Sequence, residues 1–255
     1  MIVRQFSQYF AIVCLLCVFT CSSLWAQKKK AANFPEGIIT YKIEASGNEL
    51  GAAEQFPNTT NIQLFIKDKS SCLDIAMMNG FVRLQLVYNA KEEKTFMLMD
   101  MPFAQESKIA IHLDKESLAG ILPQDQLDNL NQEADPEALK KAVKKVKGSK
   151  RIAKYNCKKA QIELPDEAKD VVLEFYVTDK IRTNNFTQFV DALKGFPLGM
   201  DIKIESTQIA FYATEVEQKS ILDSRFSIPS EYTVKSFEEF KGLFEDKIDE
   251  KVIGL

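Results

Sequence analysis

The chain has few of the residues on which most catalytic and metal sites depend. It contains a single histidine, His112, and no Gly-x-Ser-x-Gly motif that would mark a serine nucleophile. A zinc site would have to combine His112 with distant cysteines and scattered carboxylates, and their spacing fits no zinc motif. Carboxylate pairs such as Glu92-Glu93 lie in hydrophilic turns, where solvation explains them. We therefore expect a protein that is not an enzyme and that uses no metal or other cofactor.

An excess of positive charge is also absent. The chain has 33 lysines and arginines against 36 acidic residues, which gives a net charge of −3 at pH 7. A domain that binds DNA or RNA is expected to be net basic, so we expect no nucleic-acid partner. Linkers rich in Gly, Ser or Pro are missing too, which favours a single domain.

Long hydrophobic runs are absent except at the amino terminus. Residues 1–26 place Arg4 before an apolar stretch from Phe10 to Thr20 and end in small and apolar residues, an order typical of a secretory signal. The stretch is shorter than the roughly 20 residues that cross a bilayer, which disfavours a retained anchor. Acylation at Cys21 is disfavoured because bulky residues precede it. We expect cleavage after Ala26 and no transmembrane span in the mature chain, residues 27–255.

Removal of the signal would leave two of the five cysteines, Cys72 and Cys157. Two interpretations stay open for this pair. In an oxidising compartment it could form a disulfide that closes a long loop and stabilises the fold by about 3 to 5 kcal/mol. Alternatively, both are buried thiols that pack as small hydrophobic side chains.

Most of the mature chain shows the period-two alternation of β-strands. Strands are expected at residues 39–43, 62–66, 82–88, 95–101, 107–113, 155–164, 171–178, 198–206 and 209–218. Brief connections make successive strands antiparallel. A sheet of about ten strands cannot stay flat, because neighbouring strands twist and large sheets curl. We therefore expect an α+β fold with a curved antiparallel sheet, a half-barrel whose helices pack on its concave face.

Three segments carry helix signals. Asp135-Pro136-Glu137 supplies a helix start, followed by an apolar stripe that ends at Gly148. A second helix is expected from Asn184 or Asn185 to about Gly195. A third is expected after Ser236, which forms a capping-box pattern with Glu239. Residues 114–134 are ambiguous, so residues 114–148 are expected to form a lysine-rich helical insertion.

Methionine is concentrated in one part of the sheet. Five of the six methionines after the initiator lie between Met77 and Met101, and such flexible side chains suit a surface that binds varied apolar partners. The candidate apolar lining of a ligand site is Met77, Phe81, Met97, Met99 and Met101. The alternative is that these side chains fill gaps in the core. A copper(I) site is disfavoured, because alternate residues of a strand lie about 6.6 Å apart.

Lysine gathers in the segment that follows residue 139. Its candidates for contact with an anionic surface are Lys140, Lys141, Lys144 and Lys145, and each lysine near a charged lipid surface contributes about 1 kcal/mol. The alternative is a solvated helix face without a partner.

Several segments resemble a family of secreted Gram-negative bacterial domains of unknown function (DUF4412-like), which is similar in fold to the periplasmic carriers of outer-membrane lipoproteins. The most specific segment is Phe226-Ser227-Ile228-Pro229-Ser230-Glu231-Tyr232, and Ile152–Ala160, Phe175–Asp179 and Gly37–Tyr41 resemble further strands. The resemblance implies a curved half-barrel with helices against its concave face, and a periplasmic or outer-membrane-associated location. It supplies no catalytic residues.

Two functions follow as hypotheses. The first is a binding protein of the cell envelope that holds a lipid or acyl chain in an apolar concavity. The second is an envelope protein-interaction or structural module, whose concavity is filled by its own side chains.

Overall fold

The computed structural model describes residues 34–46, 60–103, 106–114, 140–163, 171–184, 187–204, 207–240 and 242. The expected secretory signal, residues 1–26, lies outside the described residues. So do residues 115–139 of the expected insertion.

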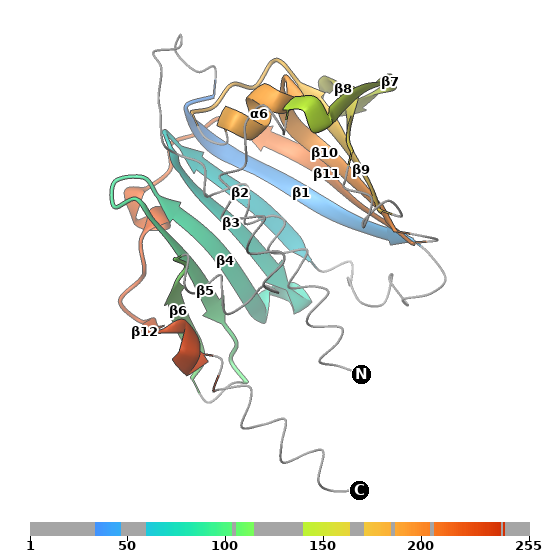
Figure 1. Ribbon diagram of the computed structural model, residues 1–255. Helices are drawn as coiled ribbons and strands as arrows, with labels where there is room; N and C mark the ends of the chain where they lie inside the picture. Colours follow the sequence, from blue (N-terminus) through green and yellow to red (C-terminus); the bar gives the residue numbers. More distant parts are fainter. Residues whose placement is uncertain are drawn as a thin grey trace, which may run out of the picture.

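Twelve strands of the described chain form one sheet (Figure 1). They are β1 (Glu36–Ser46), β2 (Asn61–Lys67), β3 (Ser70–Met77), β4 (Val82–Asn89), β5 (Lys94–Asp100), β6 (Lys108–His112), β7 (Val143–Ile152), β8 (Tyr155–Ile162), β9 (Val171–Thr178), β10 (Phe196–Ile204), β11 (Thr207–Glu217) and β12 (Thr233–Lys235). Their order is β12-β6-β5-β4-β3-β2-β1-β11-β10-β9-β8-β7. All neighbours are antiparallel except β12, which runs parallel to β6.

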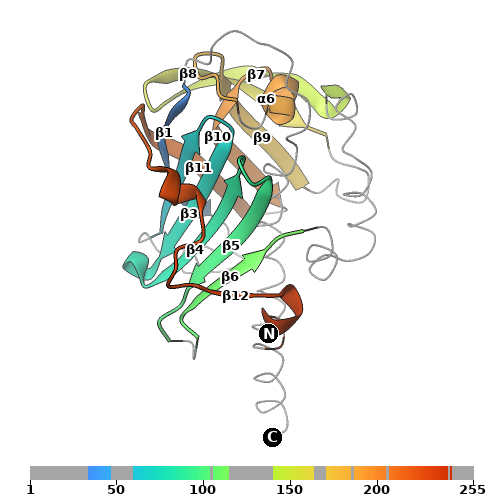
Figure 2. The ribbon, with the colours of Figure 1, turned by 90° about the vertical axis from the view of Figure 1, so that its left-hand side faces the viewer.

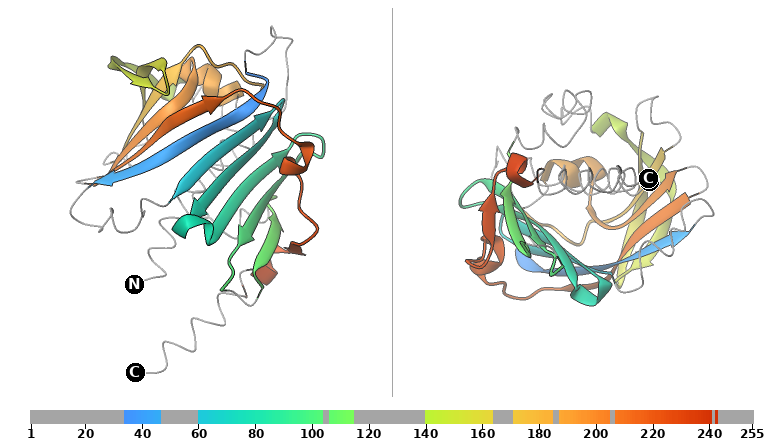
Figure 3. Two further views of the ribbon diagram at one scale, coloured as in Figure 1. Left: turned by 180° about the vertical axis from the view of Figure 1, so that it is seen from behind. Right: turned by 90° about the horizontal axis from the view of Figure 1, so that it is seen from below.

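The first strand lies in the middle of the sheet and joins two arms. One arm continues from β2 to β6 and β12, and the other from β11 to β7. Seen from below, the sheet is strongly curved, with the two arms on either side of β1 (Figure 3). We call the concave side the inner face and the convex side the outer face.

The sequence predicted a sheet of about ten strands and gave the bounds of nine, so three of the twelve observed strands had no predicted counterpart. The curved, mostly antiparallel sheet is confirmed, but β3, β7 and β12 were not expected. The sequence predicted a helix that runs to Gly148, and this prediction was wrong for residues 143–148, which belong to β7. Among the described residues of this segment, 140–142 form a helical turn and β7 begins at Val143. Gly148 lies at a bulge in the β7–β8 pairing and not at a helix end.

Two expected helices are present. α6 spans Thr187–Leu193, and the backbone N–H of Gly195 closes its end by donating to the carbonyl of Val190 at 3.0 Å. A short helix follows Ser236, whose hydroxyl accepts from the N–H of Glu239 at 3.2 Å. The Glu239 carboxylate accepts in return from the N–H of Ser236 at 2.7 Å, which completes the capping box.

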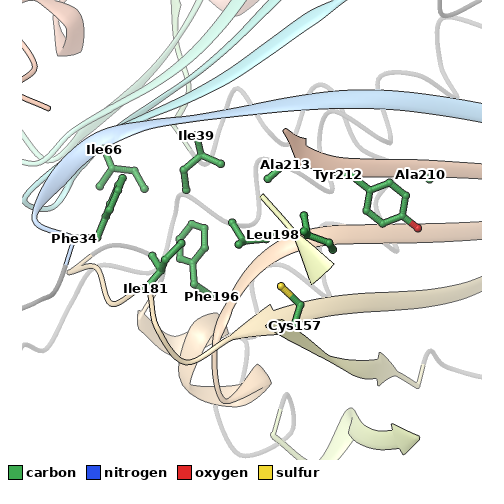
Figure 4. Packing of buried hydrophobic residues seen from close by; sticks show 11 residues of the cluster. Phe34, Ile39, Ile66, Cys157, Ile181, Phe196, Leu198, Ala210, Tyr212 and Ala213 are labelled. Atoms are coloured by element: carbon green, nitrogen blue, oxygen red, sulfur yellow. The ribbon is translucent and has the colours of Figure 1, made fainter. Parts of the chain in front are cut away.

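The buried core follows the curve of the sheet. Where β1 meets both arms, Ile39 and Ile66 pack with Phe34, Ile181 and Phe196 (Figure 4). Strands β9 to β11 carry a second cluster that includes Phe175, and the side chain of Leu193 joins it from α6.

Candidate functional site

A carboxy-terminal strap, residues Gln218–Tyr232, covers the outer face of the β3–β6 arm. Figure 1 shows it running along the outside of these strands. Its buried Ile221 and Phe226 pack on Cys72, Val87 and other apolar side chains of this arm. Ile228 and Tyr232 pack against the same cluster, so the most specific segment of the resemblance, Phe226–Tyr232, is part of this strap.

A buried carboxylate fixes the strap to the sheet. Asp74 projects from β3 and is only 3% exposed. It accepts from Arg83 Nε at 2.8 Å, from Gln85 Nε2 at 3.1 Å and from the guanidinium of Arg225 in the strap. Burial alone would raise the pKa of Asp74, but the hydrogen bond from Arg83 and the two guanidinium charges hold it below its usual value. The outer face of this arm is therefore closed by residues of the chain itself.

The inner face is less completely covered. Several apolar side chains of the middle strands, β1 to β4, are only half-buried there, although Ile39, Ile62, Ile66 and Leu86 on the same face are buried. We call these half-buried residues the apolar patch: Tyr41, Ile43, Leu64, Leu73, Ile75 and Leu84. The strand pairing makes the patch continuous, because Leu64 lies opposite Leu73 and Ile75 lies opposite both Ile62 and Leu84.

The methionines expected to line a ligand site are only partly accessible. Met97 and Met99 lie on the inner face of β5 but are 3% and 9% exposed, because they pack with Ile109 and Ile111. Met77 and Met101 are half-buried at the ends of β3 and β5. Phe237 and Phe240 of the carboxy-terminal helix pack against the same cluster.

Phe81 lies apart from the inner face. It follows the short 3-10 helix η1 (Met78–Gly80), and its ring stacks on that of Phe103 with centroids 6.1 Å apart. Met78, Phe81 and Phe103 are 61%, 52% and 67% exposed. We call these three residues the apolar tip. It lies where β3 and β5 end, next to Met77 and Met101, so apolar surface runs from the tip toward the inner face.

The structure places the expected lysines on a hairpin at one edge of the sheet. Lys140 and Lys141 lie in the helical turn before β7, and Lys144 and Lys145 lie in β7 itself. All four are exposed, and Lys144 forms an ion pair with Glu163. β7 lies five places from β1 in the strand order, yet its Val143 packs against the same core cluster as Tyr41 and Ile43 of the apolar patch.

The outer face of the second arm carries polar contacts. Tyr212 donates from its hydroxyl to the buried carboxylate of Asp201, and burial together with this bond raises the pKa of Tyr212. The Lys150 ammonium lies 3.5 Å from the centroid of the Tyr212 ring. Glu174 pairs with Lys159 at 2.6 Å. The buried carboxylates of Asp201 and Glu174 therefore both have partners within the fold.

The two cysteines are free and buried, so the disulfide is not formed. Cys72 lies under the strap on β3, and Cys157 lies on β8 in a different core cluster. Burial raises the pKa of the Cys72 thiol to about 12 and that of the Cys157 thiol to about 11. The two thiols behave as small hydrophobic side chains.

Sequence reasoning missed most of the apolar patch. The missing signal was available in Cys72-Leu73-Asp74-Ile75-Ala76-Met77, where Leu73, Ile75 and Met77 alternate with residues of the outer face. A buried aspartate in the middle of the segment obscured it. His112, the one histidine, packs edge-on against Phe96 at 5.3 Å between ring centroids.

Within the described ranges, no group of three or more His, Cys, Asp or Glu side chains could hold a metal ion. Nor does any helix described in the structure have both the length and the apolar character needed to cross a bilayer.

Comparisons with known proteins add two distant structural likenesses. PNGF-II is 14% identical with a TM-score of 0.45, over 82% of this chain and 32% of its own. A DUF1329 family protein from Desulfovibrio piger is 10% identical with a TM-score of 0.34, over 76% of this chain and 90% of its own. The chain thus spans about a third of the length of PNGF-II. No family model and no curated protein matches, so membership of the DUF4412-like family is not confirmed.

Proposed function

We propose that this chain is a non-enzymatic binding protein of the cell envelope that holds an acyl chain or similar apolar ligand on the inner face of its sheet. The observation that carries the proposal is the apolar patch. A sheet face that is open to water normally carries polar side chains, whereas this half-covered one carries Tyr, Ile and Leu. Contiguous apolar surface that stays partly accessible to solvent is a candidate binding site.

The two arms give the patch a shape suited to a chain-like ligand. Leu193 of α6 packs at one end of the inner face and Phe240 at the other, and the concave middle lies between them. In this proposal α6 and the carboxy-terminal helix flank the ligand, while Met77 and Met101 connect the patch with the apolar tip. The tip is then the side from which an apolar ligand enters.

The alternative is a module whose inner face is filled by its own side chains and whose partners are envelope proteins. The deep burial of Met97 and Met99 favours it, because these side chains already have apolar neighbours. It also means that a charge at either position would unfold the protein under both hypotheses. The test must therefore use the half-buried positions.

Enlarging the patch separates the two hypotheses. Ile43→Trp and Ile75→Trp add bulk at positions that are open in the first hypothesis and packed in the second. The mature protein, purified without detergent, is compared with each variant by native and denaturing mass spectrometry, together with thermal unfolding. Lys42→Trp is the matched control, because it lies next to Ile43 on the outer face and is exposed.

A bound ligand predicts a lipid-sized mass that disappears on denaturation. We expect both inner-face variants to lose this mass while keeping the melting temperature of the parent, and the control to keep both. Destabilisation by about 1 to 3 kcal/mol in the inner-face variants, with no extra mass in any protein, is the signature of overpacking and would support the self-filled module.

Two further parts of the proposal have their own tests. The amino-terminal residue of the secreted protein should be Gln27 if the signal is cleaved after Ala26. If the apolar tip is the entrance, the double variant Phe81→Ser and Phe103→Ser should take up offered fatty acid more slowly and reach the same final occupancy. An unchanged uptake rate would rule out this route.

A further inference from the structure

The basic residues of this chain are strongly segregated. Residues 140–162 contain ten lysines and arginines and no acidic residue, so this segment alone carries a charge of +10. The rest of the chain then holds 23 basic and 36 acidic residues, a net charge of −13. The small net charge of the whole protein therefore hides a large separation of charge.

The structure shows that this segment is a hairpin at the edge of the sheet. β7 is the last strand of one arm and pairs only with β8 among the described strands (Figure 2). We call residues 140–162 the basic hairpin. Six of its cations are exposed and have no ion-pair partner among the described residues: Lys141, Lys145, Lys147, Arg151, Lys154 and Lys158.

Protection of a sheet edge does not account for so many charges. One or a few lysines on an edge strand are enough to discourage pairing with another chain. The turn between β7 and β8 also carries more positive charge than protection of the edge requires. Ala153 and Lys154 both have positive φ, 44° and 73°, in a two-residue turn where Asn and Gly fit without strain. A lysine at this place holds a further positive charge at the end of the hairpin, in a backbone conformation that is unfavourable for it.

We infer that the basic hairpin docks the protein on a bilayer that contains anionic phospholipids. Charge complementarity supplies the attraction, and clusters of this size on a protein surface are sufficient to hold it at such a bilayer. The acidic remainder of the chain is repelled by the same surface. Docking is therefore oriented, with the hairpin toward the headgroups. This inference does not depend on whether the inner face holds an apolar ligand.

The test uses sedimentation of the mature protein with vesicles. One set contains phosphatidylglycerol in phosphatidylcholine and the other contains phosphatidylcholine alone, each at low and at physiological salt. The hairpin variant combines Lys145→Glu, Lys147→Glu and Arg151→Glu, three exposed cations without partners. The matched control combines Lys69→Glu, Lys94→Glu and Lys194→Glu, which are exposed on other parts of the protein and change the net charge equally.

We expect the parent protein to bind only the anionic vesicles and to bind more weakly as salt increases. Loss of three contacts of about 1 kcal/mol each should weaken binding about a hundredfold in the hairpin variant. The control should bind within a few fold of the parent. Circular dichroism and thermal unfolding check that both variants fold.

Three results would overturn the inference. Equal losses in the two variants would mean that net charge and not the hairpin governs binding. Equal binding to both kinds of vesicle would assign the contact to the apolar tip. A folded parent protein that ignores anionic vesicles at low salt, or that forms salt-sensitive dimers through the hairpin instead, would exclude a docking role.

Discussion

Removal of the Arg225 charge should open the strap without unfolding the sheet. Arg225 donates to the buried Asp74 and its guanidinium lies 3.9 Å from the centroid of the Phe65 ring. Arg225→Met keeps an apolar stem over that ring and removes the charge. Asp74 would retain Arg83 and Gln85, so the loss is at the lower end for a charged hydrogen bond, about 2 kcal/mol.

The thiol of Cys72 reports this opening. It is fully buried under Ile221 and Phe226 of the strap, whereas Cys157 is buried in another cluster and has no contact with it. If the strap opens and closes faster than a thiol reagent reacts, the labelling rate follows the open population. A change of about 2 kcal/mol then raises the rate at Cys72 about thirtyfold.

The measurement is a labelling time course under native conditions, with each cysteine quantified by peptide mass spectrometry. Lys219→Met is the matched control, because it removes an exposed ion pair with Glu217 from the same segment. We expect Cys72 to become reactive in Arg225→Met alone and Cys157 to stay protected. Equal acceleration at both cysteines would show global unfolding, and no acceleration would refute the role of the ion pair.

Three further predictions concern other parts of the fold. Gly37→Ala should destabilise by about 3 kcal/mol in denaturant unfolding, because its Cβ would lie 2.2 Å from the Glu217 carbonyl oxygen, whereas Gly242→Ala, with nothing within 4 Å, should be neutral; similar midpoints for the two would contradict this. Hydrogen bonds from two lysines hold the pKa of Asp223 at about 2. The ionised carboxylate therefore stabilises the fold fully above the pKa of the unfolded chain, and this stabilisation is lost as the pH falls toward 2. The melting temperature of Asp223→Asn should depend less on pH in this range than that of the parent, and an unchanged slope would exclude the effect. Ser236→Ala should cost about 1 kcal/mol in the carboxy-terminal helix, seen as faster amide exchange there and nowhere else.

The sequence was sufficient where burial and strand period agree. In β1, β2 and β4 apolar side chains recur at alternate positions, so the strands and their antiparallel pairing could be predicted. The capping box at Ser236 was predictable because it depends only on residues three apart. These features are local, and distant parts of the chain do not change them.

Distant pairing decides two of the three strands that sequence reasoning missed, β3 and β7. β3 carries Asp74 on its outer face, which looks like a turn residue until Arg83 and Arg225, 151 residues away from it, neutralise it. β7 carries a helical pattern of lysines and valines, yet pairing with β8 makes it a strand. Intrinsic preference is small beside a ladder of backbone hydrogen bonds.

The candidate site could not be predicted for the same reason. The position of the apolar patch depends on the pairing of β1 with both β2 and β11. This pairing joins residues that are far apart in the sequence, such as Thr40 and Glu215. The sequence identified the right kind of residue in the methionines but placed the opening too near β5. The half-buried residues are instead aliphatic and tyrosine side chains of the central strands, β1 to β4.

The apolar patch and the basic hairpin differ in physical character, so salt should separate their contributions. Attraction between the hairpin and anionic headgroups is screened within about a Debye length, roughly 8 Å at physiological ionic strength. Burial of apolar surface is not weakened in this way. A protein that carries cargo between bilayers needs a docking contact that can be released while its cargo stays bound, and two surfaces of unlike character at different places on one sheet provide that. Raising the salt concentration should therefore release the protein from anionic vesicles with its lipid-sized mass intact, and loss of both together would mean that one surface serves both contacts.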